Sequence, residues 1–121
     1  MAKHEVLKNH IESLRNSLPE LKGVLLGSNE GLPIAHSLAS GIDPNRLAAM
    51  AAAASNVGRK INDQLSLGSL SEVNVQCEDG CLFVYAAGNK AVLVVYGPLG
   101  ANAGLIHLES RGVADAIAAL F

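Results

Sequence analysis

Along the chain, segments with strand-like hydrophobic runs alternate with segments whose hydrophobic residues have helical spacing. The strand-like runs differ in how many of their faces we expect helices to cover. Residues 82–87 and 91–96 are continuously apolar, which is typical of strands that have helices over both faces. Residues 72–77 instead alternate between apolar and polar side chains, so we expect an edge strand with one buried face. A second edge is predicted at 32–37, because Pro33 cannot donate a hydrogen bond to a neighbouring strand.

Helical spacing appears in three segments. Apolar residues recur every three to four positions over 6–21, over 47–65, and again near the carboxyl end. The middle helix has a clear start, because Asp43 is suited to cap it and Pro44 fits its first position. The element order is α-β-β-α-β-β-β-α. We therefore predict one α+β domain over residues 1–121, a five-stranded antiparallel sheet with helices on both faces.

The middle helix is predicted to be apolar on two sides. Its main stripe is expected on the sheet and comprises Leu47, Met50, Ala51, Ala54, Val57, Gly58, Ile61 and Leu65. Alanines also make the reverse side of its first half apolar, which lets another helix approach closely. We favour a second copy of the chain there over alanines tolerated in solvent, because the polar edge strand can also pair with its copy. The predicted dimer contacts are Ala48, Ala49, Ala52, Ala53, Asn56, Glu72, Asn74 and Gln76.

Composition narrows the class of protein and its partners. The net charge is −2 and the hydrophobic fraction is 50%, so the chain has a large aliphatic core and no basic field for nucleic acid. The longest apolar run, 47–54, is far shorter than the ~18 residues of a membrane span, and we expect a cytoplasmic protein. Cys77 and Cys81 are expected to be free and buried, although a cross-strand disulfide between them is conceivable.

The motifs of several catalytic and cofactor-binding sites are missing. The glycine-rich segment 97–104 lacks both the Walker A and the dinucleotide-binding spacing. The serines do not form a G-x-S-x-G elbow, and the carboxylates show no paired spacing. The C-x₃-C spacing of the two cysteines does not fit a zinc site. We therefore expect no enzyme activity, no cofactor and no metal.

Several short segments, taken in order, resemble the Roadblock family, whose members include dynein light chains and bacterial and archaeal regulators of Ras-like GTPases. Gly23-Val24-Leu25-Leu26 followed by Glu30-Gly31-Leu32-Pro33-Ile34-Ala35 is similar to the first hairpin of the family. The exit 65–68, the hairpin around Gly80, the Gly88-Asn89 turn and residues 102–105 also match. Glu30 stands where Asp is commoner, but the turn depends mainly on Gly31.

The resemblance implies a Roadblock-like or profilin-like fold and a homodimer in which the long helices pack together and the third strands pair. It further implies a platform for a small Ras-like GTPase. The candidate partner contacts are Arg46, Arg59, Lys60 and Asp63, for which a solvated face is the alternative. Two other functions stay open, namely a small-ligand sensor and a scaffold subunit without a GTPase partner.

Overall fold

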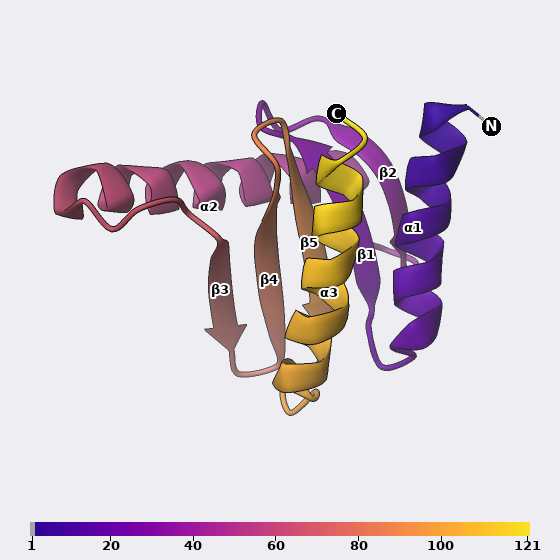
Figure 1. Cartoon of the computed structure of the whole chain (residues 1–121). Coiled ribbons are helices and arrows are strands. Elements are labelled where there is room, and N and C mark those ends of the chain that lie inside the picture. The colour runs from indigo at the N-terminus through magenta and orange to yellow at the C-terminus, as the bar shows by residue number, and fades with distance from the viewer. Residues whose placement is uncertain (1) are drawn as a thin grey trace.

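The computed structural model describes residues 2–121 and contains three helices and five strands in the predicted order (Figure 1). The elements are α1 (Lys3–Ser17), β1 (Gly23–Ser28), β2 (Pro33–Leu38), α2 (Pro44–Leu65), β3 (Glu72–Cys77), β4 (Gly80–Ala87), β5 (Ala91–Gly97) and α3 (Ala103–Ala118). The predicted α+β class and element order are therefore confirmed.

The sheet is antiparallel throughout and has the strand order β2-β1-β5-β4-β3. The predicted edges are correct: β2, which begins at Pro33, lies at one edge, and β3 lies at the other. The apolar strand β5 is central, between β1 and β4, and every residue from Ala91 to Val95 is buried. A continuously apolar run thus marks a strand that is covered on both faces.

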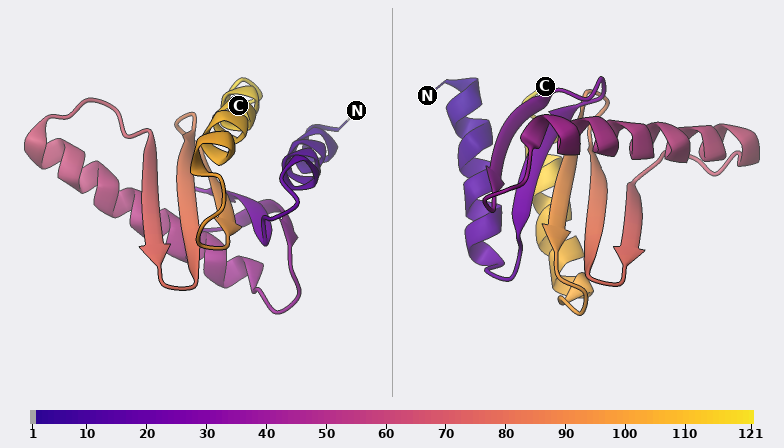
Figure 2. Two further views of the ribbon diagram at one scale, coloured as in Figure 1. Left: turned by 90° about the horizontal axis from the view of Figure 1, so that it is seen from below. Right: turned by 180° about the vertical axis from the view of Figure 1, so that it is seen from behind.

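Helices cover both faces of the sheet, with α1 and α3 on one face and α2 on the other (Figure 2). The strands serve both layers through the alternation of their side chains. Phe83 and Tyr85 belong to the core under α1 and α3, whereas Val84 belongs to the core under α2.

Helix α2 crosses the sheet and continues past its edge. Its amino end is capped as expected, because the Asp43 carboxylate accepts a hydrogen bond from the Asn45 amide at 3.0 Å. Its carboxyl end stops at Ser66, which adopts a left-handed φ of 55°. Figures 1 and 2 show the second half of α2 extending beyond β3. Gly58 still packs against Leu70 and Val73, so within the described structure it is the last turns of α2 that extend past the sheet.

The predicted assignment of the two sides of α2 is only partly correct, because Leu47 and Ala51 pack on the sheet as expected but the larger side chains do not. Buried positions on α2 are Leu47, Ala48, Ala51, Ala52 and Ser55. Four large side chains expected on the sheet are exposed instead, namely Met50 (55%), Val57 (57%), Ile61 (50%) and Leu65 (64%).

The β1–β2 hairpin explains this rotation of α2. A Cβ atom added at Gly31, whose φ is +94°, would lie 3.2 Å from the Ala49 Cα and 3.6 Å from the Ala52 Cβ. A Cβ atom at Gly27 would lie 3.6 Å from the Ala48 Cβ. The small alanine side chains therefore admit the hairpin of the same chain. Ala48 and Ala52, predicted as dimer contacts, are buried inside one subunit, so their assignment to the dimer interface is wrong.

The edge strand β3 is less covered than its alternating pattern suggested. Val73 is half-buried and packs under α2, whereas Val75 is 40% exposed and Cys77 is also exposed. Both cysteines are free, as expected, but only Cys81 is buried. The reason is that no other element of the chain covers the second half of β3 on the α2 side of the sheet, where it borders an open groove.

Candidate protein interface

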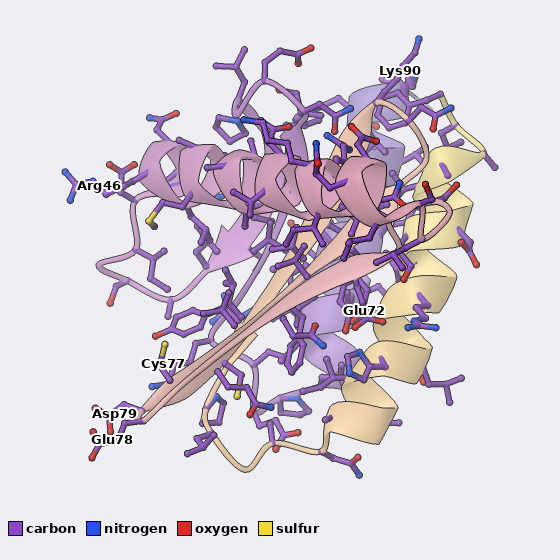
Figure 3. The ribbon with its side chains drawn as sticks, turned by 90° about the vertical axis from the view of Figure 1, so that its left-hand side faces the viewer. Arg46, Glu72, Cys77, Glu78, Asp79 and Lys90 are labelled. Carbon is purple, nitrogen blue, oxygen red and sulfur yellow. The ribbon has the colours of Figure 1, made fainter. Side chains whose placement is uncertain are left out.

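An apolar groove runs between the first half of α2 and the strands β3 and β4. Its volume is about 580 Å³, and its apolar walls come from Ile42, Leu47, Met50, Val75, Leu82 and Tyr96. The rim is charged, with Arg46 on the helix side and the Glu78–Asp79 turn on the sheet side (Figure 3). We call this surface the sheet groove. It exists because α2 leaves the second half of β3 uncovered.

The overhanging half of α2 presents a second apolar surface. Val57, Ile61 and Leu65 recur at spacing of four along it, and each is at least half exposed. We call these three residues the overhang face. Leu67, in the following loop, is 67% exposed and extends the same region of the chain. A row of exposed, large apolar side chains is typical of a surface that binds another molecule.

A smaller hollow of about 370 Å³ lies between the overhang and the start of β3. Val57 and Ile61 line it from the helix, and Leu70 and Val73 line it from the loop and the strand. The Asn62 side chain also lines the hollow, and its Oδ1 atom is buried without a hydrogen-bond partner among the described residues. A buried carbonyl oxygen without a hydrogen bond costs free energy, so this position favours a hydrogen-bond donor from another molecule.

The outer edge of β3 is open. In the described structure β3 pairs with β4 alone, so its other edge offers backbone N–H and C=O groups to a further strand. Asn74 and Gln76 are exposed, as a contact with a second copy requires. The Glu72 side chain is only 15% exposed and points toward α3, where it pairs with Arg111 and His107 (Figure 3). Glu72 is therefore committed to its own chain.

The four candidate partner contacts lie on α2 but differ in whether their side chains already form hydrogen bonds within the chain. Arg59 is held by its own chain, because its guanidinium donates to Asn29 Oδ1 and to Asn56 Oδ1, each at 3.3 Å. Arg46, Lys60 and Asp63 are exposed. Arg59 thus ties α2 to the end of β1, whereas Lys60 and Asp63 are open to solvent on the overhanging half.

The remaining predicted dimer contacts on α2 are Ala49, Ala53 and Asn56, and all three are exposed. Ala53 adjoins the overhang face, because it stands four residues before Val57, and Ala49 stands four residues before Ala53. Sequence reasoning placed the stripe of Met50 and the overhang face on the sheet, although its signal was visible: four large aliphatic residues continue at helical spacing over a 22-residue helix, longer than this sheet is wide.

Nothing in the described residues assembles a metal centre, since no group of three or more His, Cys, Asp or Glu side chains converges there. Among residues 2–121, no helix is long and apolar enough to cross a membrane. The features that stand out are apolar surface and an open strand edge, which are suited to binding protein.

Comparison with known proteins agrees with this fold. The model of the Roadblock/LC7 domain matches residues 7–97. The chain belongs to the Roadblock/LC7 family. The predicted resemblance is confirmed, although helix α3 lies outside the matched residues.

Relatives in sequence are found in an archaeon. This Roadblock/LC7 chain is 30% identical over 106 residues to the uncharacterized protein MJ0310 of Methanocaldococcus jannaschii, covering 88% of the chain and 92% of the relative. The uncharacterized protein MJ0714 of the same organism is also 30% identical over 106 residues, covering 88% of the chain and 89% of the relative.

Solved structures share the whole fold. MglB of Myxococcus xanthus superimposes with a TM-score of 0.91 at 18% identity, covering 100% of this chain and 91% of that one. The gliding protein MglB of Thermus thermophilus gives 0.87 at 22% identity, covering 99% and 91%. A Schizosaccharomyces pombe profilin gives 0.67 at 11% identity, covering 94% and 98%, which confirms the profilin-like arrangement. At these identities the likeness shows the fold alone.

Proposed function

We propose that the chain is a non-enzymatic, homodimeric interaction module that binds a small Ras-like GTPase and regulates or scaffolds it. The observation that carries the dimer is the match between the overhang face and the sheet groove. Membership of the Roadblock/LC7 family supports the GTPase part, because the family includes regulators of Ras-like GTPases.

Pairing of β3 with a second copy makes the two apolar surfaces meet. Antiparallel pairing of identical edge strands produces a twofold axis perpendicular to the sheet. That axis carries the partner's α2 to the same face of the sheet and points its overhang back toward the first subunit. The uncovered half of β3 and the sheet groove lie where that overhang arrives. Each subunit then supplies one helix half and one groove to its partner.

The apolar contribution to this dimer is substantial. Complete burial of a Val, Leu, Ile or Met side chain contributes about 1.5–3 kcal/mol. Met50, Val57, Ile61 and Leu65 are half or more exposed, so covering them contributes about 1 kcal/mol each in each subunit. The sum over two subunits is of the same order as the estimated entropic cost of association, about 4–15 kcal/mol. Hydrogen bonds between the β3 strands add to it.

The GTPase contact is assigned to the outer layer of the paired α2 helices. Exposed charges lie there, namely Arg46 at the rim of the sheet groove and Lys60 and Asp63 on the overhanging half. Charges at the rim of an interface mainly govern the rate of encounter and the choice of partner. Arg59 has a structural role, because Asn29 and Asn56 already hold its guanidinium.

Capture of nucleotide-loaded GTPases tests the proposed partner. Purified chain is immobilised and offered the Ras-like GTPases of its own organism, loaded with GDP or with a non-hydrolysable GTP analogue. Binding that depends on the nucleotide, and that weakens in Lys60→Glu but not in the matched surface variant Glu12→Lys on α1, supports the proposal. Absence of nucleotide-dependent capture refutes the GTPase partner and leaves the dimer to be judged by sedimentation.

One observation favours the sensor alternative. The sheet groove has a volume and an apolar lining within the range of small-molecule sites, about 300–1,000 Å³. Native mass spectrometry of the purified chain distinguishes the two occupants. A bound small molecule supports a sensor, whereas a dimer mass without added ligand supports a groove filled by the partner's helix. A dimer that captures no GTPase is the outcome expected of a scaffold subunit.

A further inference from the structure

A polar cluster joins the edge strand to the opposite helical layer. The Tyr85 hydroxyl on β4 lies 2.6 Å from Nδ1 of His107 on α3, and the same nitrogen lies 3.4 Å from Oε2 of Glu72, the first residue of β3. The other oxygen of Glu72, Oε1, pairs with the Arg111 guanidinium. Phe83 packs its ring edge-on against His107, with 5.0 Å between the ring centroids. Residues from three elements thus meet at one imidazole nitrogen.

When His107 is neutral, its imidazole carries a single N–H group and no charge, so the ion pair with Glu72 is absent. If Tyr85 donates to an unprotonated Nδ1, the Glu72 carboxylate faces that nitrogen without a hydrogen between them. Burial raises the pKa of the Tyr85 phenol, and the Glu72 carboxylate raises it further, so Tyr85 keeps its own proton.

Protonation of His107 resolves this arrangement. The charged imidazole carries a hydrogen on Nδ1, which donates toward the Glu72 carboxylate, and the two groups then have opposite charges. We propose that Glu72, His107 and Tyr85 form a proton-dependent clamp that fixes the start of β3 to α3 when His107 is charged. The titratable and charged groups around His107 are Glu72 from β3, Tyr85 from β4 and Arg111 from its own helix.

The clamp acts on an edge strand. β3 has one neighbouring strand and an uncovered second half, so the contacts of Glu72 add to those of Val73 in holding its first residues. Histidine changes charge between about pH 5 and 8, so the strand is held more firmly toward the acidic end of that range. The consequence for assembly rests on the proposed homodimer: a firmly held β3 presents its open edge to the partner in the pairing geometry.

A double-mutant cycle tests the clamp. Glu72→Gln, His107→Gln and the double variant are unfolded with urea at about pH 5.5 and about pH 8, on either side of the ordinary titration range of histidine. A partly exposed ion pair contributes up to about 1 kcal/mol, so the expected coupling is about three- to fivefold in the unfolding equilibrium constant at the lower pH. The coupling should be close to onefold at the higher pH. Equal coupling at both pH values, or none at either, overturns the proposal.

Two further measurements complete the test. His10→Gln on α1 is the matched control and should leave the pH dependence of unfolding unchanged, because His10 lies outside the cluster. If a variant fails to fold, the unmodified chain is examined by amide hydrogen exchange at both pH values, corrected for the intrinsic rate. The Val73 amide should exchange more slowly at the lower pH, and unchanged protection overturns the clamp.

The proposed clamp and the proposed dimer can be refuted independently. A chain that sediments as a monomer refutes the proposed homodimer, yet the coupling between Glu72 and His107 is still measurable in that monomer. A dimer without pH-dependent coupling retains the proposed function and removes the clamp. If both hold, the dimer dissociation constant should be severalfold lower at about pH 5.5 than at about pH 8, and His107→Gln should abolish that difference.

Discussion

Ile61→Glu separates assembly of the dimer from folding of the subunit. The Ile61 side chain is 50% exposed in one chain and lies on the overhang face, beside the hollow that Leu70 and Val73 also line. A glutamate there stays partly solvated in the isolated subunit, so the free energy of unfolding should fall by only about 1 kcal/mol, the contribution of the half of Ile61 that is buried within the chain. In the proposed dimer the same carboxylate enters the partner's apolar groove twice, once in each subunit.

The magnitude follows from two terms. Each substitution removes about 1 kcal/mol of apolar burial at the interface. Each buried carboxylate adds a desolvation cost of about 1–2 kcal/mol even where it keeps part of its water. The two copies together weaken the dimer by about 4–6 kcal/mol, which is about a thousandfold or more in the dissociation constant.

Analytical ultracentrifugation over a wide concentration range measures this dissociation constant. Ala49→Glu is the comparison variant, because it places the same charge on an exposed residue of the same helix that was predicted as a dimer contact but lies outside the overhang face. We expect Ile61→Glu to sediment as a folded monomer and Ala49→Glu to remain a dimer. If Ala49→Glu dissociates the dimer and Ile61→Glu does not, the interface lies on the alanine side of α2 and the argument from the overhang is refuted.

Three further predictions concern the same surfaces and core. Cys77 lines the sheet groove, so thiol labelling followed by mass spectrometry should modify it faster in Ile61→Glu than in the unmodified dimer, while buried Cys81 should stay protected in both; equal rates for Cys77 contradict a covered groove. Ala52→Glu should lower the free energy of unfolding of the subunit by several kcal/mol in urea, because Ala52 is buried against the β1–β2 hairpin. An unchanged free energy of unfolding would contradict tight packing at this position. The raised pKa of Tyr85 means that the unfolded chain loses this proton first, so stability should fall as pH rises above about 10, the ordinary tyrosine value; Tyr85→Phe should remove that part of the slope, and an unchanged slope assigns it to other groups.

The sheet was readable from the sequence because coverage of a strand determines which of its positions must be apolar. Pro33 at the start of β2 marked one edge, and the alternation in β3 marked the other. The unbroken apolar run of β5 marked the centre. Each of these signals is local, because it is carried by a few consecutive residues. Their side chains and backbone N–H groups must suit either solvent or protein at that place in the sheet.

The rotation of α2 was not readable in the same way. Its alanines and its larger aliphatic residues form two apolar sides, and either side fits a sheet by helical spacing alone. The choice depends on how closely the Gly31 turn approaches the helix at Ala49 and Ala52, which is a contact between segments about 20 residues apart. Ala48 and Ala52 were therefore misassigned to a dimer interface, and the overhang face was missed.

The sequence by itself determined the number, order and type of the elements, the two edges of the sheet and the Roadblock likeness, because these follow from periodicity, from proline and from turn residues that act within a few positions. Only the tertiary structure decided which side of α2 is buried. It also decided that the second half of α2 extends past β3 and that the Glu72 side chain points to His107 rather than to solvent. Those features arise from contacts between segments distant along the chain. No local pattern of residues specifies such distances, because they depend on how all the elements pack at once.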